Sequence, residues 1–184
     1  QTLIVTGNAH EASVRDQVPD SDVVVEPSMR GTTGAIGLAA AIIQREHGDV
    51  VVGSFAADHV IQDEEAFLAA VRTAIRSAED GYVATIGIAP ERPSTAYGYI
   101  HAVSRPEEGS GADKLEADGS AALPVEEFVE KPDASTAAGY LATGEYFWNA
   151  GMFVAKTSVL LAALERFHPE IAAPLLELAA RWGG

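Results

Sequence analysis

The sequence has no cysteine, few basic residues and no long apolar run, and each absence excludes a class of protein. Without cysteine there is no disulfide framework, no thiolate zinc site and no cysteine nucleophile. No apolar stretch approaches the roughly 20 residues that a membrane helix needs. A cysteine-free chain of this kind fits the reducing cytoplasm, where we expect the protein to act without a membrane partner.

Basic residues are outnumbered, because 12 Lys and Arg stand against 27 Asp and Glu, a formal charge of −15. This balance argues against nucleic acid as a partner, since phosphate backbones attract clustered cations. It leaves room for a small phosphorylated ligand, which a few cations, backbone amides and a divalent metal can hold. The 184 residues, 47% hydrophobic and 21% charged, suit one globular domain.

The first half of the chain alternates short apolar stretches with helical patterns. Strands are predicted at 2–6, 22–27, 49–57 and 82–90, and helices at 9–18, 32–48 and 63–81. Thr32 or Thr33 is the expected N-cap of the second helix, and Asp63 that of the third. Strand–helix–strand order with short connections favours parallel pairing. We therefore predict an α/β fold with a Rossmann-like, mostly parallel sheet and flanking helices.

The second half has a different pattern, which predicts a small antiparallel part. Strands are expected at 96–104, 125–133 and 146–155, the last interrupted at 149–151, and helices at 134–144, 157–167 and 169–182. A polar, Gly- and acid-rich stretch at 105–123 predicts a flexible loop within a hairpin. No internal repeat or second domain is evident, so residues 1–184 are interpreted as one domain.

The stretch DVVVGSFAADHVI (49–61) reads as a strand buried on both faces that delivers Asp58 and His59 at its end. Ligands of open α/β sheets lie outside the carboxyl ends of parallel strands. A carboxylate there is well placed to hold Mg²⁺, which prefers oxygen ligands and shares its shell with phosphates. Taken alone, Asp58 is better explained as a turn or cap residue.

Four other segments carry weak signals of the same kind, and the first, third and fourth also have a plain structural explanation. EPSMRGTTGAIG (26–37) puts an acid, an arginine and small residues between a strand and a helix, where backbone amides converge. TAYGYI (95–100) sets a glycine between tyrosines, FVEKPD (128–133) ends a strand with Glu and Lys, and WNAGMF (148–153) interrupts a strand. Their alternatives are a strand-end acid in solvent, a surface charge pair and a turn or bulge.

Read in order, these segments resemble the sugar nucleotidyltransferases, and most of all the bacterial mannose-1-phosphate guanylyltransferases. EPSMRGTTGAIGLAA is similar to the family's EP…RNTA.AI..AA, and AADHVI to its ADH.I. GIAPERPSTAYGYI, FVEKP and YFWNAGMF match three further family motifs. The five motifs keep the family's order over roughly residues 3 to 171.

The resemblance implies transfer of a guanylyl group from GTP to α-D-mannose 1-phosphate, giving GDP-mannose and pyrophosphate. Asp58 would bind Mg²⁺ and Lys131 would neutralise the sugar phosphate, as the catalytic pair. Glu130 and Asn149 would hold mannose hydroxyls, and the Gly98 backbone would approach the sugar. The guanine site would be formed by four residues: Glu26, Arg30, Thr32 and Thr33.

The sequence also departs from the family pattern. Gly31 stands where the family often has Asn, Gly34 where it often has Pro, and Ala150 where it often has Ser. The glycine-rich loop that wraps the triphosphate, a second metal-binding aspartate and a C-terminal region have no counterpart here. We therefore expect an incomplete nucleotidyltransferase domain. A homodimer is compatible with the sequence, which leaves the oligomeric state open.

Two other functions remain as alternatives. A sister enzyme, such as a glucose-1-phosphate thymidylyl- or uridylyltransferase, would share the sheet, the metal acid and the Glu-Lys-Pro segment. A non-catalytic nucleotide-sugar-binding or regulatory module is the alternative of another class, since the triphosphate loop is absent. The presence of Asp58, Glu130 and Lys131 speaks for an enzyme.

Overall fold

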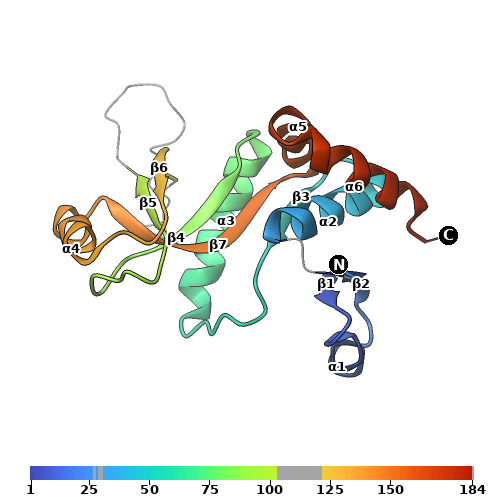
Figure 1. Ribbon diagram of the computed structural model, residues 1–184, viewed down its shortest axis with the longest axis horizontal. Coiled ribbons are helices and arrows are strands. Elements are labelled where there is room, and N and C mark those ends of the chain that lie inside the picture. The colour runs from blue at the N-terminus through green and yellow to red at the C-terminus, as the bar shows by residue number, and fades with distance from the viewer. Residues whose placement is uncertain (27, 29–30, 103–121, 184) are drawn as a thin grey trace. The chain divides into compact units, whose positions relative to one another are not determined.

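The computed structural model describes residues 1–26, 28, 31–102 and 122–183, and its elements are labelled in Figure 1. The chain divides into two compact units. Unit 1 comprises Gln1–Val52 and Lys156–Gly184, and unit 2 is the intervening segment Gly53–Ala155. Both units combine helices with strands, which confirms the α/β class. In the described part of the chain, no helix combines the length and apolar character needed to cross a membrane.

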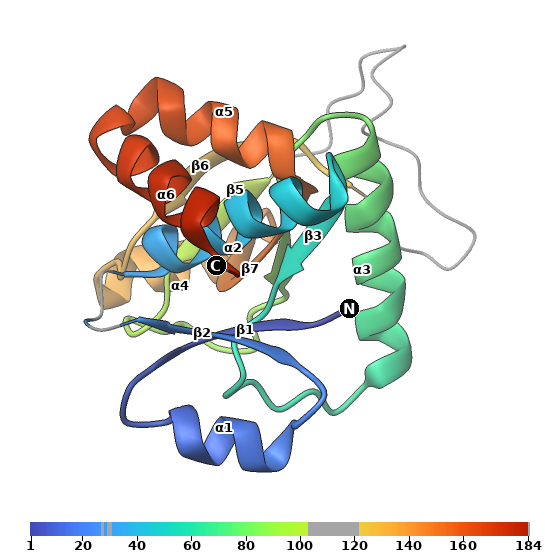
Figure 2. The same cartoon turned by 90° about the vertical axis from the view of Figure 1, so that its right-hand side faces the viewer.

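Unit 1 begins with the predicted strand–helix–strand unit. Strands β1 (Leu3–Gly7) and β2 (Asp22–Glu26) pair in parallel, with Leu3 opposite Asp22 and Gly7 opposite Glu26. Helix α1 (Glu11–Gln17) makes the connection and lies on one side of the pair, while the other helices of the unit lie on the opposite side (Figure 2).

The core of unit 1 is built from three helices that follow these strands. They are α2 (Thr32–His47), α5 (Thr157–Phe167) and α6 (Pro169–Arg181). Small residues of α2 allow close packing: a Cβ at Gly37 would lie 2.7 Å from Leu164 Cδ1 and 2.8 Å from Leu175 Cδ1. The buried cluster combines Val24, Ala40, Ala41, Ile42, Leu161 and Ala179.

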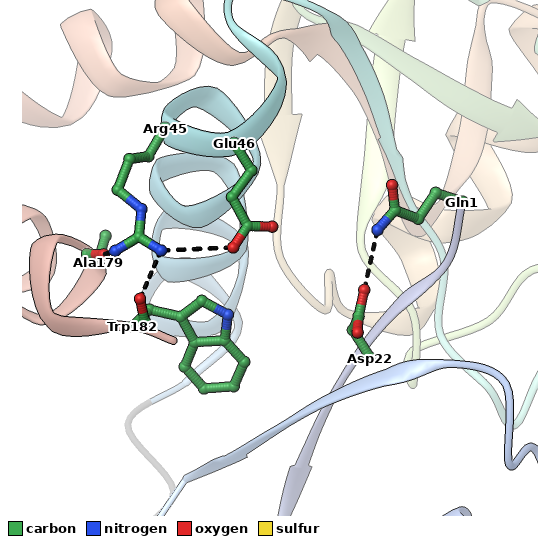
Figure 3. Close-up of polar contacts among 6 residues, drawn as sticks. All are labelled: Gln1, Asp22, Arg45, Glu46, Ala179 and Trp182. Carbon is green, nitrogen blue, oxygen red and sulfur yellow. Dashed lines mark hydrogen bonds and ion pairs between the residues drawn. The ribbon is translucent and has the colours of Figure 1, made fainter. Parts of the chain in front are cut away.

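Polar contacts secure both parts of unit 1 (Figure 3). The Arg45 guanidinium donates to the backbone carbonyls of Ala179 and Trp182, so it binds the carbonyl end of α6 to α2. Gln1 Nε2 donates to Asp22 Oδ2 at 2.9 Å across the β1–β2 pair.

Helix α5 is capped by a carboxylate from far away in the sequence. Asp49 Oδ1 accepts the backbone N–H of Ser158 at 3.0 Å and the hydroxyl of Thr157 at 3.2 Å. These bonds, the one to the Ser158 backbone foremost, lower the pKa of Asp49 below 3.8. Next to them the Thr157 N–H donates to the Val50 carbonyl at 2.9 Å.

Unit 2 is built on a mixed arrangement of strands and two helices. The strands are β3 (Val51–Ser54, where the chain passes from unit 1), β4 (Ala84–Ile88), β5 (Tyr99–Ala102), β6 (Val125–Val129) and β7 (Tyr146–Lys156). The helices are α3 (Glu64–Glu79) and α4 (Ala134–Thr143). The strand order is β3-β7-β5-β6, and β4 also pairs with β7.

Strands β5, β6 and β7 pair antiparallel, as the sequence predicted for the second half of the chain, but β4, which was expected in the parallel part, also pairs antiparallel with β7. Strand β5 is antiparallel to both β6 and β7. Among the strand pairs whose register is defined in the described part of the chain, only β1–β2 is parallel. Strand β7 runs antiparallel to strands that precede it by many residues. Such long-range pairing is not encoded in local alternation, which is why the sequence pattern did not place β4 beside β7.

Several element boundaries were predicted well and others were not. Asp63 and Asp133 cap α3 and α4 as expected, and Gly144 ends α4 in the left-handed region at φ 72°. The N-cap of α2 is Gly31, so Thr32 and Thr33 lie in the first turn instead. Most of the predicted 105–123 loop, residues 105–121, lies outside the described residues.

Candidate functional site

Three predicted site residues form one row across the antiparallel strands of unit 2. Tyr99 of β5 is paired with Val129 of β6 and with Trp148 of β7. Because the strands are antiparallel, the next step along each of them aligns Gly98 with Glu130 and with Asn149. The Asn149 N–H donates to the Gly98 carbonyl at 2.8 Å, which confirms this alignment. We call Gly98, Glu130 and Asn149 the site row.

Glycine is required at the centre of the site row because the Glu130 carboxylate lies over it. A Cβ at position 98 would be 2.8 Å from Glu130 Oε2 and 3.6 Å from Asn149 Cβ. Contacts below 3 Å force a displacement, so any side chain at 98 would move the carboxylate. The backbone of Gly98 therefore lies at the floor of a space bordered by an acid and an amide.

Lys131 adds a cation beside the site row. Its Nζ lies 2.8 Å from Glu130 Oε1, and both side chains are largely exposed, at 62% and 70%. The hydrogen bond with Glu130, and the negative charge of that carboxylate, raise the pKa of Lys131. Among described residues other than glycine, Lys131 alone has positive φ, at 47°. Side chains rarely adopt this conformation, and it is concentrated at functional sites.

The turn that carries Lys131 is held firmly on its far side. Pro132 is buried and Asp133 caps α4, with its Oδ1 accepting from the Thr136 N–H at 2.8 Å. The hydrogen bond from the Thr136 backbone foremost lowers the pKa of Asp133. An exposed lysine on a fixed turn can present its charge to a ligand without reordering the backbone.

Asn149 is oriented by its own strand. Its Oδ1 accepts the Gly151 N–H at 3.0 Å, and Gly151 has φ 68°. The interruption predicted at 149–151 takes the form of an irregularity within the strand: β7 runs on through these residues, and its register with β4 shifts there. The bond uses the carbonyl end of the carboxamide, whose NH₂ end supplies two donors for a ligand hydroxyl.

The chain matches the family model described as "Nucleotidyl transferase" over residues 1–181. It belongs to the nucleotidyl transferase family. Among the curated relatives, the xanthan biosynthesis protein XanB of Xanthomonas campestris pv. campestris (strain B100) is 43% identical over 175 residues, covering 92% of this chain and 34% of that protein. The mannose-1-phosphate guanylyltransferase of Escherichia coli K12 is 39% identical over 176 residues, covering 92% of this chain and 35% of that protein.

Solved structures agree with this family membership. The structure titled mannose-1-phosphate geranyltransferase, from Thermus thermophilus, matches with a TM-score of 0.83 and 31% identity, covering 98% of this chain and 49% of that one. The structure titled mannose-6-phosphate isomerase, from Helicobacter pylori, gives 0.78 and 25% identity, covering 98% and 65%. The chain spans about a third of the length of the curated relatives that it matches.

The predicted metal ligand of this nucleotidyl transferase chain lies in a turn beyond β3. The strand is shorter than predicted and ends at Ser54, and it is half-buried and partly exposed, not buried on both faces. Asp58 and His59 are both exposed. No group of three His, Asp or Glu that could hold a metal occurs among the described residues. A single exposed carboxylate does fit Mg²⁺ that is shared with substrate phosphates, because this ion keeps few protein ligands.

The predicted guanine-binding residues belong to unit 1. Glu26 ends β2 opposite Gly7 and is half-buried, and Thr32 and Thr33 are exposed at the first turn of α2. Gly31, at φ 82°, precedes them. Arg30 lies outside the described residues. The end of β2 and the first turn of α2 therefore carry three of the four residues, and their use by a nucleotide stays a prediction.

Sequence reasoning missed the residues that support the site row from behind. Tyr97 contacts the Trp148 ring edge-to-face at 5.1 Å, the Arg92 guanidinium lies 5.5 Å from the same ring, and the Tyr99 hydroxyl bonds the backbone of Ser94. A signal was present, since TAYGYI and WNAGMF place aromatic residues directly beside Gly98 and Asn149. Alternation along a strand sends such neighbours to the opposite face, where they can pack beneath a site.

Proposed function

We propose that the protein carrying this chain transfers a guanylyl group from GTP to α-D-mannose 1-phosphate, giving GDP-mannose and pyrophosphate. The observation that carries the proposal is the site row with Lys131 beside it, in a chain whose relatives include named mannose-1-phosphate guanylyltransferases. To bind a sugar phosphate, a protein needs groups that accept hydrogen bonds from the sugar hydroxyls, a group that donates to them, and a cation near the phosphate. Unit 2 supplies all of these on adjacent strands.

Each residue has a defined role in this proposal. Glu130 accepts hydrogen bonds from sugar hydroxyls, and the Asn149 carboxamide donates to them. The Gly98 backbone lies against the sugar, and Lys131 neutralises its phosphate. The Lys131 ammonium is paired with Glu130, so a bound phosphate would replace or share that partner.

The reaction is an in-line attack of the sugar phosphate oxygen on the α-phosphorus of GTP, with pyrophosphate as the leaving group. Positioning and charge neutralisation do most of the work in phosphoryl transfer, and acid–base chemistry does little. Asp58 would hold Mg²⁺, which would supply positive charge to the phosphates. The remaining site residues would hold the two substrates in the relative position that the in-line attack requires.

Guanine would be selected by the loop that follows β2. The Glu26 carboxylate can accept from both N1–H and N2–H₂ of guanine, a pair of donors that adenine does not present. Arg30, Thr32 and Thr33 would complete the base pocket.

We also propose the Rossmann-like, mostly parallel sheet for the complete nucleotidyltransferase domain, supported by the TM-score of 0.83. Its action in the cytoplasm and as a homodimer stay predictions.

The test is a substrate panel on the full-length protein. Pyrophosphate release is measured for GTP, dTTP, UTP and ATP, each with mannose 1-phosphate and with glucose 1-phosphate. We expect GTP with mannose 1-phosphate to give a kcat/KM at least about 100-fold above other pairs. Preference for dTTP or UTP with glucose 1-phosphate would assign the sister activity. Binding of GDP-mannose without turnover of any pair would assign a non-catalytic module.

A further inference from the structure

Tyr99 makes an unusual contact for a residue in the middle of a sheet. It is fully buried, and its ring lies 5.4 Å from that of Tyr140 on α4. Its hydroxyl accepts the Ser94 N–H at 2.9 Å and donates to the Ser94 carbonyl at 3.1 Å. The backbone N–H and the carbonyl of Ser94 are thus both bound by one side chain, which fixes the position and the orientation of that residue.

The segment held in this way is the loop of residues 89–98, which connects β4 to β5 and ends at Gly98. The loop is anchored at two further points, where Tyr97 and Arg92 contact the Trp148 ring. Its last carbonyl, that of Gly98, accepts from Asn149. The path of the loop therefore determines how the Gly98 backbone is presented within the site row.

The packing of Tyr99 does not explain the hydroxyl. A phenylalanine ring would fill the same volume against Tyr140, and would leave two backbone groups of the half-buried Ser94 without their partner. Removing the partner of a buried donor or acceptor costs more than the bond itself contributes. The hydroxyl is thus used to hold the 89–98 loop, whose end enters the site.

We propose that Tyr99 is a positioning residue for sugar-phosphate recognition. Its hydroxyl binds the Ser94 backbone and so fixes the path of the 89–98 loop, which places the Gly98 backbone against the sugar. The inference rests on the proposed function, because it assigns Gly98 to the sugar. It adds a residue that touches neither substrate. Its effect is directed at one substrate only, since the predicted guanine-binding residues belong to unit 1.

The experiment is Tyr99→Phe in the full-length protein, with steady-state kinetics for both substrates. We expect the KM for mannose 1-phosphate to rise about 10-fold, while kcat and the KM for GTP stay within about 3-fold of wild type. Tyr140→Phe removes a hydroxyl from the same aromatic group and leaves the Tyr99–Ser94 bonds in place. This control should retain the wild-type KM for mannose 1-phosphate.

A second readout is independent of activity. Amide hydrogen exchange at Ser94 should be faster in Tyr99→Phe and unchanged in Tyr140→Phe. A parallel rise in KM for both substrates, or unchanged exchange at Ser94, would overturn the positioning role. Wild-type protein that fails to transfer a nucleotide to any sugar phosphate would instead reject the proposed function. The two failures are therefore distinguishable.

Discussion

A Cβ atom on Gly98 would lie 2.8 Å from Glu130 Oε2, so the absence of a side chain at one residue sets the position of the carboxylate at the other. The two residues come from adjacent strands that are aligned by the pairing of Tyr99 with Val129. The relationship is functional in the proposed enzyme because both groups face the sugar. It also makes a direct prediction.

Gly98→Ala should impair sugar binding without unfolding the protein. The Glu130 side chain is exposed and can move, so the substitution displaces the carboxylate and leaves the sheet intact. Loss of a hydrogen bond to a charged group, about 1.5–3 kcal/mol, corresponds to a KM for mannose 1-phosphate raised about 10- to 100-fold. Steady-state kinetics checks this. An unchanged KM for the sugar phosphate would contradict the site row.

Asp58→Asn should lower kcat on the order of 100-fold and raise the Mg²⁺ concentration needed for half-maximal rate. The reason is that a carboxamide keeps the size of the side chain but lacks the charge that holds the ion. Asp63→Asn is the matched control, because Asp63 caps α3 through the Ala66 N–H and asparagine is an equally good cap. Full activity of Asp58→Asn at saturating Mg²⁺ would remove Asp58 from the metal site.

Glu26→Gln should reduce the preference for GTP over ATP by at least about 10-fold. The carboxylate accepts two guanine donors, whereas a glutamine side chain presents one acceptor and one donor. Competition between the two nucleotides for a fixed amount of mannose 1-phosphate measures the ratio. If the ratio is the same as in wild type, guanine is selected elsewhere.

The Asp49 cap predicts how the stability of unit 1 depends on pH. Hydrogen bonds, chiefly the one from the Ser158 backbone N–H, lower the pKa of Asp49 in the folded state below its ordinary value. A depressed pKa contributes stability above the unfolded value, and this contribution is lost as the pH falls through the folded value. Asp49→Asn should therefore lower the urea midpoint at neutral pH.

The difference in urea midpoint between wild type and Asp49→Asn should be smaller at about pH 3 than at about pH 5. Asp20→Asn makes the same change of charge at an exposed turn residue of unit 1 and serves as the control. A difference that stays constant over this range would mean that the carboxylate charge contributes nothing to the cap.

Two glycines within helices should respond to alanine in opposite directions. At Gly37 a Cβ would meet Leu164 and Leu175 at less than 3 Å, so Gly37→Ala should destabilise unit 1 by about 1–3 kcal/mol. At Gly139 of α4 nothing lies within 4 Å, so Gly139→Ala should stabilise by about 0.5–1 kcal/mol. Urea unfolding measures both. Equal shifts would show that helix propensity alone decides.

The sequence predicted local features of this fold better than long-range ones. The caps of α3 and α4 were predicted because the capping carboxylates accept from N–H groups only three residues away. The N-cap of α2 was wrong, since Gly31 at φ 82° takes that position before Thr32. The interruption predicted at 149–151 is a shift of register with β4 and not an end of β7, and the Asn149 side chain bonds the Gly151 N–H within it.

The candidate site shows the same division. Motif wording identified Gly98, Glu130 and Asn149, but their alignment depends on β5 pairing with β6 on one side and with β7 on the other. Spacing along the chain contains no information on that register. The Tyr99–Ser94 bonds were missed for a related reason, because a buried tyrosine in a strand looks like any core residue until its hydroxyl partner is seen.

Unit 1 is made from the two ends of the chain, and the N–H of Thr157 meets the carbonyl of Val50 where the polypeptide leaves it and returns. A ribosome therefore delivers α2 long before α5 and α6, the helices that bury its apolar side. At ordinary elongation rates the nascent chain spends roughly 5 to 20 s making residues 53–155. Throughout that interval Ile42 and its neighbours have the strand residues Val24, Leu3 and Val5 beside them but lack Leu161 and Ala179, so part of this apolar side stays exposed until synthesis is nearly finished.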